Sequence, residues 1–306
     1  GSGDQVQAAF EAIDTNTGNA TANITGTDYD VANLKAIRAK GSGDIVLATS
    51  TTVGLSGDAT DIAAAFHGGS LNHTGVVTVT DNAYTVTELK KINDGNGGSI
   101  VLNNDDVALS GSVSDIKDAF AGTVTEHTGT LAISDTGATD IQATDITAIN
   151  VTNTGTITVQ NAIDINGSGA NVKLAFDAIN TNTGNATAHI TGTDYTVAQL
   201  KAINAKGSGA IVMATATATL EGEVADIIAA FTGSVSTNTG AITITDTTKD
   251  IDATDITTIN TAITGTITVS NAIDINGTGD EVQAAFEAIN TNTGNATANI
   301  TGTDYD

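Results

Sequence analysis

All six phenylalanines of the chain recur at nearly constant spacing. They stand at Phe10, Phe66, Phe120, Phe176, Phe231 and Phe286, so that one follows another after about 55 residues. Around Phe10, the residues Val6, Ala9 and Ile13 complete an i, i+3, i+4, i+7 pattern, which is typical of the buried face of a short helix. Related patterns surround the other phenylalanines. The chain is therefore predicted to be a tandem repeat.

A second helical pattern lies midway between successive phenylalanines and carries Leu or Ile instead of Phe. Its marker positions are Leu34, Leu89, Ile146, Leu200 and Ile256. The tyrosines keep the same spacing just upstream of these patterns, at Tyr29, Tyr84, Tyr195 and Tyr305. We call the two predicted kinds of helix Phe-type and Leu-type. Their Phe, Leu and Ile markers are the predicted repeat core of a unit of about 27 residues and a double unit of about 55 residues.

Between the helices, apolar residues alternate with threonine. In Ile242-Thr243-Ile244-Thr245, the two isoleucines share one face of the predicted strand and the threonines share the other. We therefore expect an α/β fold, an elongated repeat solenoid of strand-strand-helix units. We expect residues 1–306 to be one continuous array and a window of a longer chain, because residues 277–306 nearly reproduce residues 1–30.

Two windings of the repeat fit these patterns. Strands in one sheet lie about 4.8 Å apart, whereas packed helices lie about 8–10 Å apart. Two strands per unit in one sheet would match the width of a helix, which favours a strand-strand-helix unit repeated along an axis; the sequence leaves both windings open. Alternation of the helices between two sides of the molecule is the other possibility.

Helix starts are predicted from Thr or Ser followed by Asp. Thr or Ser can accept a hydrogen bond as the N-cap, and Asp suits the positive end of the helix dipole. The predicted caps are Thr60, Ser114, Thr144 and Thr254.

Composition excludes several classes of function. The formal net charge of -25 disfavours nucleic acid and anionic membrane surfaces as partners. No apolar run is long enough to span a bilayer, and no leader-like segment opens the sequence. The absence of cysteine removes disulfides, thiolate metal sites and cysteine nucleophiles.

One loop resembles the first half of a calcium-binding loop. In Asp14-Thr15-Asn16-Thr17-Gly18, side-chain oxygens stand at alternate positions before a glycine. The glycine comes one position too early, so an ordinary Asn/Gly turn is the preferred interpretation. Asp14 and Asn16 are the only metal candidates, and no other cofactor is expected.

Other polar residues do not form a recognisable catalytic motif. The four histidines, at positions 67, 73, 127 and 189, lie at no ligand spacing, and we expect them to be exposed turn residues. The pair Asp105-Asp106 is expected from the acidic composition alone. Threonine ladders could bind a glycan or ice, although a solvated sheet face is the simpler explanation.

Most basic residues lie on or just after the Leu-type helices. They are Lys35, Arg38, Lys40, Lys90, Lys91, Lys201 and Lys206. Lysine and arginine near the end of a helix complement its dipole. Besides complementing the helix dipoles, these residues would form a sparse positive stripe on an acidic molecule. We expect this stripe to support side-by-side association of copies.

The Thr-Asp-Ile-x-x-Ile helices and Gly-x-Ile-Thr-Val strands resemble the repeats of giant extracellular surface proteins of marine cyanobacteria and similar bacteria, including the one associated with non-flagellar swimming. This resemblance implies an exported filament or cell-surface layer without enzymatic residues. We therefore expect a structural, non-enzymatic protein that associates with further repeats or copies of itself. A calcium- or glycan-dependent adhesin stalk is the alternative. A polysaccharide lyase is disfavoured because no cluster of Arg, Lys and carboxylate residues shares a strand layer.

Overall fold

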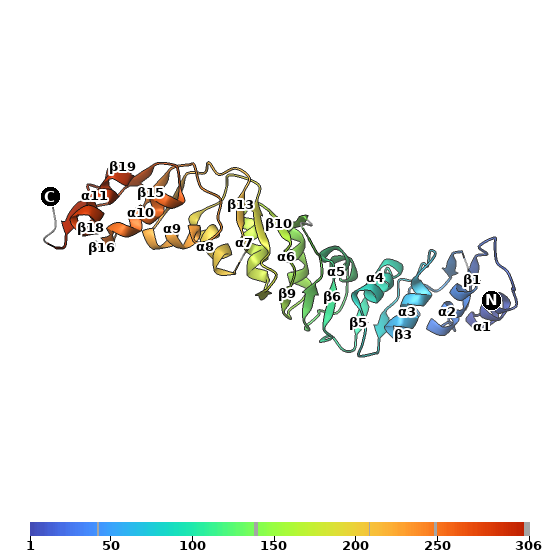
Figure 1. Cartoon of the computed structure of the whole chain (residues 1–306). Helices are drawn as coiled ribbons and strands as arrows, with labels where there is room; N and C mark the ends of the chain where they lie inside the picture. Colours follow the sequence, from blue (N-terminus) through green and yellow to red (C-terminus); the bar gives the residue numbers. More distant parts are fainter. Residues whose placement is uncertain (42, 138–139, 208, 248–249, 303–306) are drawn as a thin grey trace. The chain divides into compact units, whose positions relative to one another are not determined.

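The computed structural model describes residues 1–41, 43–137, 140–207, 209–247 and 250–302. The fold is α/β, with short helices that alternate with short parallel strands (Figure 1). Contacts divide the chain into two compact units. The first contains Gly1–Asp135 and Ala148–Thr158, and the second contains Thr136–Thr147 and the chain from Val159 on. Helix α6 (Ala143–Thr152) and strand β9 (Ile157–Val159) cross the division.

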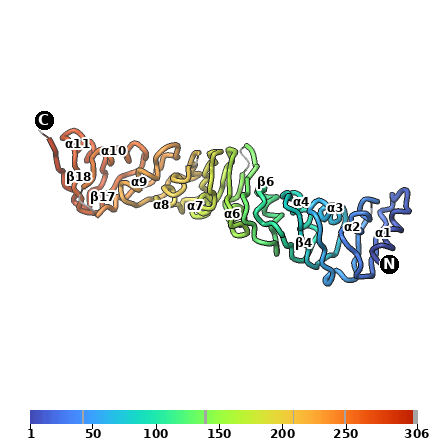
Figure 2. The backbone as a smooth tube through the Cα atoms, turned by 90° about the horizontal axis from the view of Figure 1, so that it is seen from below, coloured from blue at the N-terminus to red at the C-terminus, as the bar shows by residue number. Residues whose placement is uncertain are grey.

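In the first unit, consecutive helices contact one another and follow the order of the chain (Figures 1 and 2). The helices are α1 (Gly3–Glu11), α2 (Val31–Ala39), α3 (Ala59–Phe66), α4 (Val86–Gly95) and α5 (Val113–Ala119). The strands are β1 (Ala22–Ile24), β2 (Ile45–Leu47), β3 (Leu55–Gly57), β4 (Val77–Val79), β5 (Ile100–Leu102), β6 (Leu109–Gly111) and β7 (Leu131–Ile133).

The second unit repeats this arrangement. Its helices are α7 (Gly169–Ala178), α8 (Val197–Ala205), α9 (Val224–Phe231), α10 (Ala253–Ala262) and α11 (Gly279–Ala288). Its strands are β8 (Asp140–Gln142), β10 (Asp164–Gly167), β11 (Thr181–Asn182), β12 (Thr187–Ile190), β13 (Ile211–Met213), β14 (Leu220–Gly222), β15 (Ile242–Ile244), β16 (Asp250–Asp252), β17 (Ile267–Val269), β18 (Asp274–Gly277), β19 (Ile289–Asn292) and β20 (Thr297–Ile300).

Each sheet receives one strand from each successive repeat. Strand β4 lies between β3 and β5, and all three run parallel, with Val77 opposite Leu55 on one side and Ile100 on the other. Of the two windings considered, the one with two strands per repeat in one sheet is therefore not the one observed. The spacing argument overlooked a stagger along the chain. The step in sequence from Leu55 to its strand partner Val77 is shorter than the step from the start of α3 to the start of α4.

Strand pairing therefore advances by fewer residues than the helices do, and equivalent repeat positions do not pair with one another on adjacent strands. The stagger also moves each sheet relative to the helices, so β3 directly precedes α3 while β5 follows α4.

The core is made of the inward strand positions and the repeat markers. Ten of the eleven predicted markers are buried, from Leu34, Leu89, Ile146, Leu200, Ile256 and Phe176 at 0% exposed to Phe231 at 8%, whereas Phe286 is partly exposed. Tyr29, Tyr84 and Tyr195 are buried as well, and Tyr305 lies outside the described residues. Strands β4, β7, β9, β15 and β17 all bury their first and third residues.

The predicted N-caps of α3, α5 and α10 were wrong by two residues, because the N-caps are Asp58, Ser112 and Asp252. Helix α3 begins at Ala59, before Thr60, and α5 begins at Val113, before Ser114. The reason is a cap from the next repeat. The first backbone N–H group of each of three Phe-type helices donates to an aspartate carboxylate 22 residues further on. The pairs are Ala59 and Asp81 at 3.1 Å, Val113 and Asp135 at 2.7 Å, and Val224 and Asp246 at 2.8 Å. Helices α6 and α10 likewise begin before Thr144 and Thr254, at Ala143 and Ala253.

Candidate functional site: the junctions between repeats

Lysines at one repeat position pair with the following helix. Lys35, Lys90 and Lys201 each come directly after the Leu marker of a Leu-type helix. Their ammonium groups bind Asp61, Asp118 and Asp226, which belong to the next Phe-type helix. All of these side chains are partly exposed, so each pair contributes little by itself.

A second repeat position supplies hydrogen bonds to the end of the next helix. Asn204 Nδ2 donates to the carbonyl oxygens of Ala229 and Thr232, both at 2.8 Å, at the C-terminal end of α9. Asn93 Nδ2 donates to the carbonyl oxygen of Asp118 at 2.6 Å, at the end of α5. The last carbonyls of a helix have no partner within it, so these amides satisfy groups that would otherwise need water.

Arg38 occupies this second position in α2 and reaches further. Its Nε donates to the carbonyl oxygen of Ala65 at 3.3 Å, and its Nη2 donates to those of Gly69 at 2.9 Å and Ser70 at 3.1 Å. Burial lowers the pKa of Arg38 from its ordinary value, and Asp44 opposes that shift. The guanidinium group therefore fastens α2 to the end of α3 and to the loop that follows.

A third position connects the Leu-type helix to the preceding Phe-type helix. Lys40 Nζ donates to the carbonyl oxygen of Glu11, and Lys206 Nζ donates to that of Asp177, both at 3.2 Å. Six of the seven basic residues of the expected stripe thus bind neighbouring repeats of their own chain. Lys91, the seventh, lines a surface hollow.

Two of the histidines that we expected in exposed turns are buried. His73 is 1% exposed and His127 is 0% exposed, whereas His67 is exposed and His189 is intermediate. In each buried case Nδ1 lies 2.8 Å from an Asn Oδ1, in Asn96 or Asn153. The other nitrogen, Nε2, lies 2.9 Å from the carbonyl oxygen of Val53 or 2.8 Å from that of Val107. Both nitrogens of a buried imidazole need a hydrogen-bond partner. Here the partners come from neighbouring repeats, 20 to 26 residues away in the sequence, so local spacing did not predict that these histidines are buried.

The second unit carries a variant of this pair. Asn238 stands seven residues after Phe231, as His127 does after Phe120. Its Nδ2 donates to the carbonyl oxygen of Ala218 at 3.2 Å, and its Oδ1 accepts a hydrogen bond from the Tyr195 hydroxyl at 3.3 Å. The residue bridged to Asn238 is Ile263 instead of asparagine. Where the histidine is absent, its asparagine partner is absent too.

The calcium candidates lie in a turn. Asn16 Oδ1 accepts a hydrogen bond from the backbone N–H of Ala20 at 3.1 Å, and its Nδ2 donates to the carbonyl oxygen of Gly41 at 3.1 Å. Asn19 adopts a positive φ of 49°, which asparagine tolerates better than most residues. Asp14 is exposed beside this turn. The amide of Asn16 thus closes the turn and binds the next repeat.

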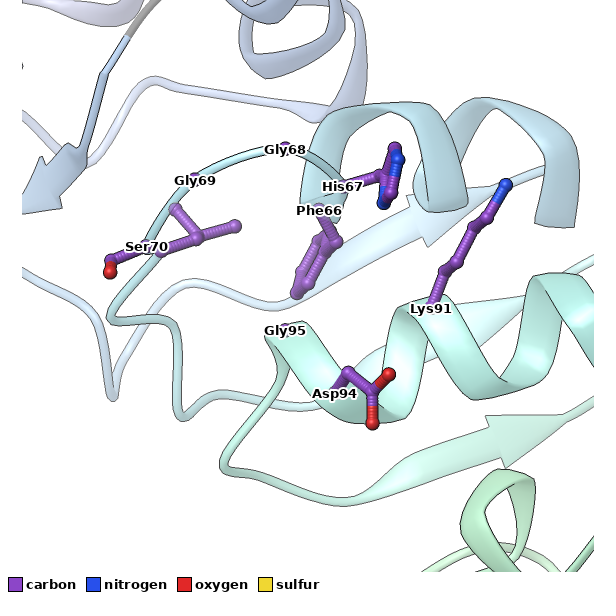
Figure 3. Close-up of a pocket in the computed structure, with 9 residues that line it drawn as sticks. Phe66, His67, Gly68, Gly69, Ser70, Lys91, Asp94 and Gly95 are labelled. Atoms are coloured by element: carbon purple, nitrogen blue, oxygen red, sulfur yellow. The ribbon is translucent and has the colours of Figure 1, made fainter. Parts of the chain in front are cut away.

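The hollow beside α3 and α4 has a volume of 410 Å³ and is lined by Phe66, His67, the loop Gly68–Leu71, Lys91, Asp94 and Gly95. Figure 3 shows the Phe66 ring directed toward Gly95, with His67 and Lys91 on one side. A Cβ atom on Gly95 would lie 2.7 Å from Phe66 Cδ1, so the ring needs glycine there. The equivalent position carries Lys40 just after α2 and Lys206 just after α8.

A similar hollow lies between α9 and α10. It measures 270 Å³ and places Phe231, Thr232, Thr258, Thr261 and Ala262 at the corresponding repeat positions. Lys91, Asp94 and His67 are therefore specific to the first hollow.

Within the described ranges, no three His, Asp or Glu residues converge where they could hold a metal ion. Among the helices described above, none is long and apolar enough to cross a bilayer. Comparison of the chain with protein-family models, with curated proteins and with solved structures finds no match.

Proposed function

We propose that this chain is a structural protein, a repeat segment of an extracellular filament or cell-surface layer. In this proposal the strand-helix repeats form an elongated solenoid, and the role of each repeat is to hold its neighbours at a fixed spacing. The role is mechanical and requires no catalytic residues.

The observation that supports the proposal most is the equivalence of the junctions. Lys40 and Lys206 occupy the same repeat position and make the same 3.2 Å bond to the preceding Phe-type helix. Lys35 and Lys201 likewise repeat one contact, to Asp61 and Asp226 at the same position of the following helix, while Lys90 binds Asp118, three residues later in its own following helix. Repeat proteins derive their stability from such nearest-neighbour interfaces, which can continue over any number of units.

Electron microscopy of source cells labelled with gold-conjugated antibody against residues 1–306 tests the location and form of the assembly. The proposal predicts label at regular intervals along a surface filament or across a surface layer. Label confined to the cell interior, or scattered on the surface without an ordered assembly, would contradict it.

A further inference from the structure

We infer that His73 and His127 each bind a proton in the folded chain, so that both side chains are imidazolium ions at neutral pH. The two sites lie in the first unit, and they make that unit more stable in mild acid. The inference goes beyond the proposed structural role and rests on the hydrogen-bond partners of the two rings.

The contacts of His127 require a hydrogen on each ring nitrogen. Nε2 lies 2.8 Å from the carbonyl oxygen of Val107, and a carbonyl oxygen can only accept a hydrogen bond. Nδ1 lies 2.8 Å from Oδ1 of Asn153, which is also an acceptor. A neutral imidazole carries a hydrogen on only one nitrogen, so it can satisfy only one of these contacts.

Rotation of the side-chain amide of Asn153 does not remove the mismatch. Its Nδ2 donates to the carbonyl oxygen of Gly155 at 3.1 Å. Exchange of the amide oxygen and nitrogen would give Nδ1 of His127 a donor, but it would place Oδ1 against the carbonyl oxygen of Gly155. Two acceptors would then face each other there. Only the imidazolium form supplies a hydrogen to every contact.

His73 has the same arrangement one double repeat earlier. Its Nε2 lies 2.9 Å from the carbonyl oxygen of Val53, and its Nδ1 lies 2.8 Å from Oδ1 of Asn96. Asn96 Nδ2 donates to the carbonyl oxygen of Ser99 at 3.4 Å, which orients this amide in the same way. The mismatch in the neutral form is therefore a property of the repeat position.

The second unit fills the equivalent position without a proton. Asn238 Nδ2 carries two hydrogens and donates to the carbonyl oxygens of Ala218 at 3.2 Å and Gly240 at 3.1 Å. Ala218 precedes Asn238 by 20 residues, as Val107 precedes His127. The position thus requires two donated hydrogens. An amide nitrogen supplies both, whereas an imidazole supplies both only when it is protonated.

Burial acts on these rings in two opposite ways. His73 is 1% exposed and His127 is 0% exposed, so water cannot replace a missing partner of the neutral form. Burial also disfavours a charge, and the two acceptors of each ring counteract that effect. The ring centroids of Phe66 and Phe120 lie 5.8 and 5.4 Å from those of His73 and His127, within the distance of about 6 Å at which an aromatic ring attracts a cation.

Carboxylates predominate around His127. Asp105 Oδ1 accepts a hydrogen bond at 3.1 Å from Oγ1 of Thr128, the residue that follows His127. The other charged or titratable groups on the segments that contact this ring, or next to them, are Tyr84, Asp106, Glu126 and, on α5, Asp115, Lys117 and Asp118. Nearby negative charges favour the protonated form of histidine.

The charges around His73 are more evenly balanced. They are Asp61 on α3 and Glu88, Lys90, Lys91 and Asp94 on α4, together with the titratable side chains of Tyr29 and His67. His127 should therefore hold its proton more strongly than His73 does.

Proton binding gives the stability of the chain a pH dependence of defined sign. Unfolding exposes both histidines, and a free histidine loses its proton near neutral pH. Because the folded chain retains the protons, unfolding releases them, and the free energy of unfolding falls as the pH rises. Buried neutral histidines would give the opposite sign, because they take up protons when they unfold in acid.

The first test determines the protonation of each ring nitrogen. Long-range ¹H–¹⁵N correlation spectra of the full chain with ¹⁵N-labelled histidine are recorded at pH 7.0, and His73→Asn and His127→Asn assign the two buried rings. Both nitrogens of each buried ring should show the similar ¹⁵N shifts of protonated nitrogens, whereas the two nitrogens of a neutral ring differ widely. A bare nitrogen in either buried ring overturns the inference.

The second test measures the proton linkage at His127. The variant His127→Asn with Asn153→Ile carries the pair of the second unit and has no titratable side chain at this position. Urea unfolding compares it with the unaltered chain between pH 8 and pH 6. The folding equilibrium constant of the unaltered chain should rise relative to that of the variant by up to about tenfold for each unit of acidification.

His67→Asn is the matched control, because His67 is exposed, and it should leave the pH dependence of the unaltered chain in place. A relative equilibrium constant that falls in acid, or that does not change, overturns the inference. The spectra decide the question if the double variant does not fold. Neither result bears on the labelling experiment under Proposed function, because an array can form with these rings in either state.

Discussion

The imidazole Nδ1 of His127 lies 2.8 Å from Oδ1 of Asn153, and both side chains are buried in the first unit. The second unit replaces the histidine by Asn238 and the asparagine by Ile263, which a backbone bridge brings together. The chain thus fills the same pair of interior positions in two ways, His with Asn in the first unit and Asn with Ile in the second. Exchanging one pair for the other tests how the two residues depend on each other.

Asn153→Ile should destabilise the chain by about 1–3 kcal/mol, because it leaves Nδ1 of His127 buried without a partner. His127→Asn with Asn153→Ile reproduces the pair of the second unit and should recover most of that loss. Tyr84 stands before residue 127 at the same separation as Tyr195 before Asn238, so a hydroxyl is placed for the new amide. Urea unfolding of the two single variants and the double variant measures the coupling. Additive losses would contradict the pairing.

Asn204→Ala should cost about 1–2 kcal/mol, because it removes two hydrogen bonds to the end of α9. Asn260 occupies the same repeat position in α10 and is exposed, which makes it the matched control. Asn260→Ala should change the free energy of unfolding by no more than about 0.5 kcal/mol. Equal losses in the two variants would show that the amide at this position does not act through the neighbouring helix.

Lys201→Met should destabilise the chain by only about 0.2–1 kcal/mol, because Lys201 and Asp226 pair at the surface. The effect should shrink further in high salt, which screens exposed charges. Urea unfolding at low and high salt, in a double-mutant cycle with Asp226→Asn, checks both statements. A coupling that is large and insensitive to salt would contradict the assignment of a surface pair.

Tyr84 should make stability fall at alkaline pH. Burial, with the nearby Asp105, Asp106 and Asp81, raises its pKa to about 12 from an ordinary value of 10.0. The folded state therefore favours the neutral phenol. That contribution is complete below pH 10 and is lost as the pH rises through about 12.

Urea midpoints between pH 9 and pH 12 measure the decline, and Tyr84→Phe is the control. Phenylalanine lacks the ionisable group and also loses the hydrogen bond to the carbonyl oxygen of Asn104, so its curve should be lower but flatter. Parallel curves for the two chains would contradict the role given to Tyr84.

The repeat itself could be predicted because it depends only on the spacing of apolar residues within short segments of the sequence. The markers around Phe66 and Leu89 identify helices without knowledge of their neighbours, and both side chains are buried. The junctions could not be predicted in this way. The cap of α3 comes from Asp81, and the partner of His127 comes from Asn153, so both depend on how one repeat faces the next.

The sequence could not decide between the two windings for a related reason. An estimate from strand and helix widths treats each layer separately, whereas the strands and the helices advance by different steps along this chain. Leu55 meets its partner Val77 after a shorter step than the one that separates the starts of α3 and α4. The sequence alone also did not predict the hollow beside Gly95. Glycine stands there where the equivalent positions carry Lys40 and Lys206, and this difference can be interpreted only once the contact of those lysines is known.

The central claim is that equivalent residues join any repeat to the next, and deletion of repeats in phase tests it most directly. Gly57 and Gly222 occupy the same position, at the ends of β3 and β14 and just before α3 and α9. Removal of residues 58–222 therefore joins Gly57 to Glu223 with the repeat phase intact, whereas removal of residues 58–209 shifts the phase by about half a unit. Circular dichroism during thermal unfolding should show the parent helix content per residue and a cooperative transition for the in-phase deletion only. Loss of structure in the in-phase deletion, or equal folding of both, would contradict the account.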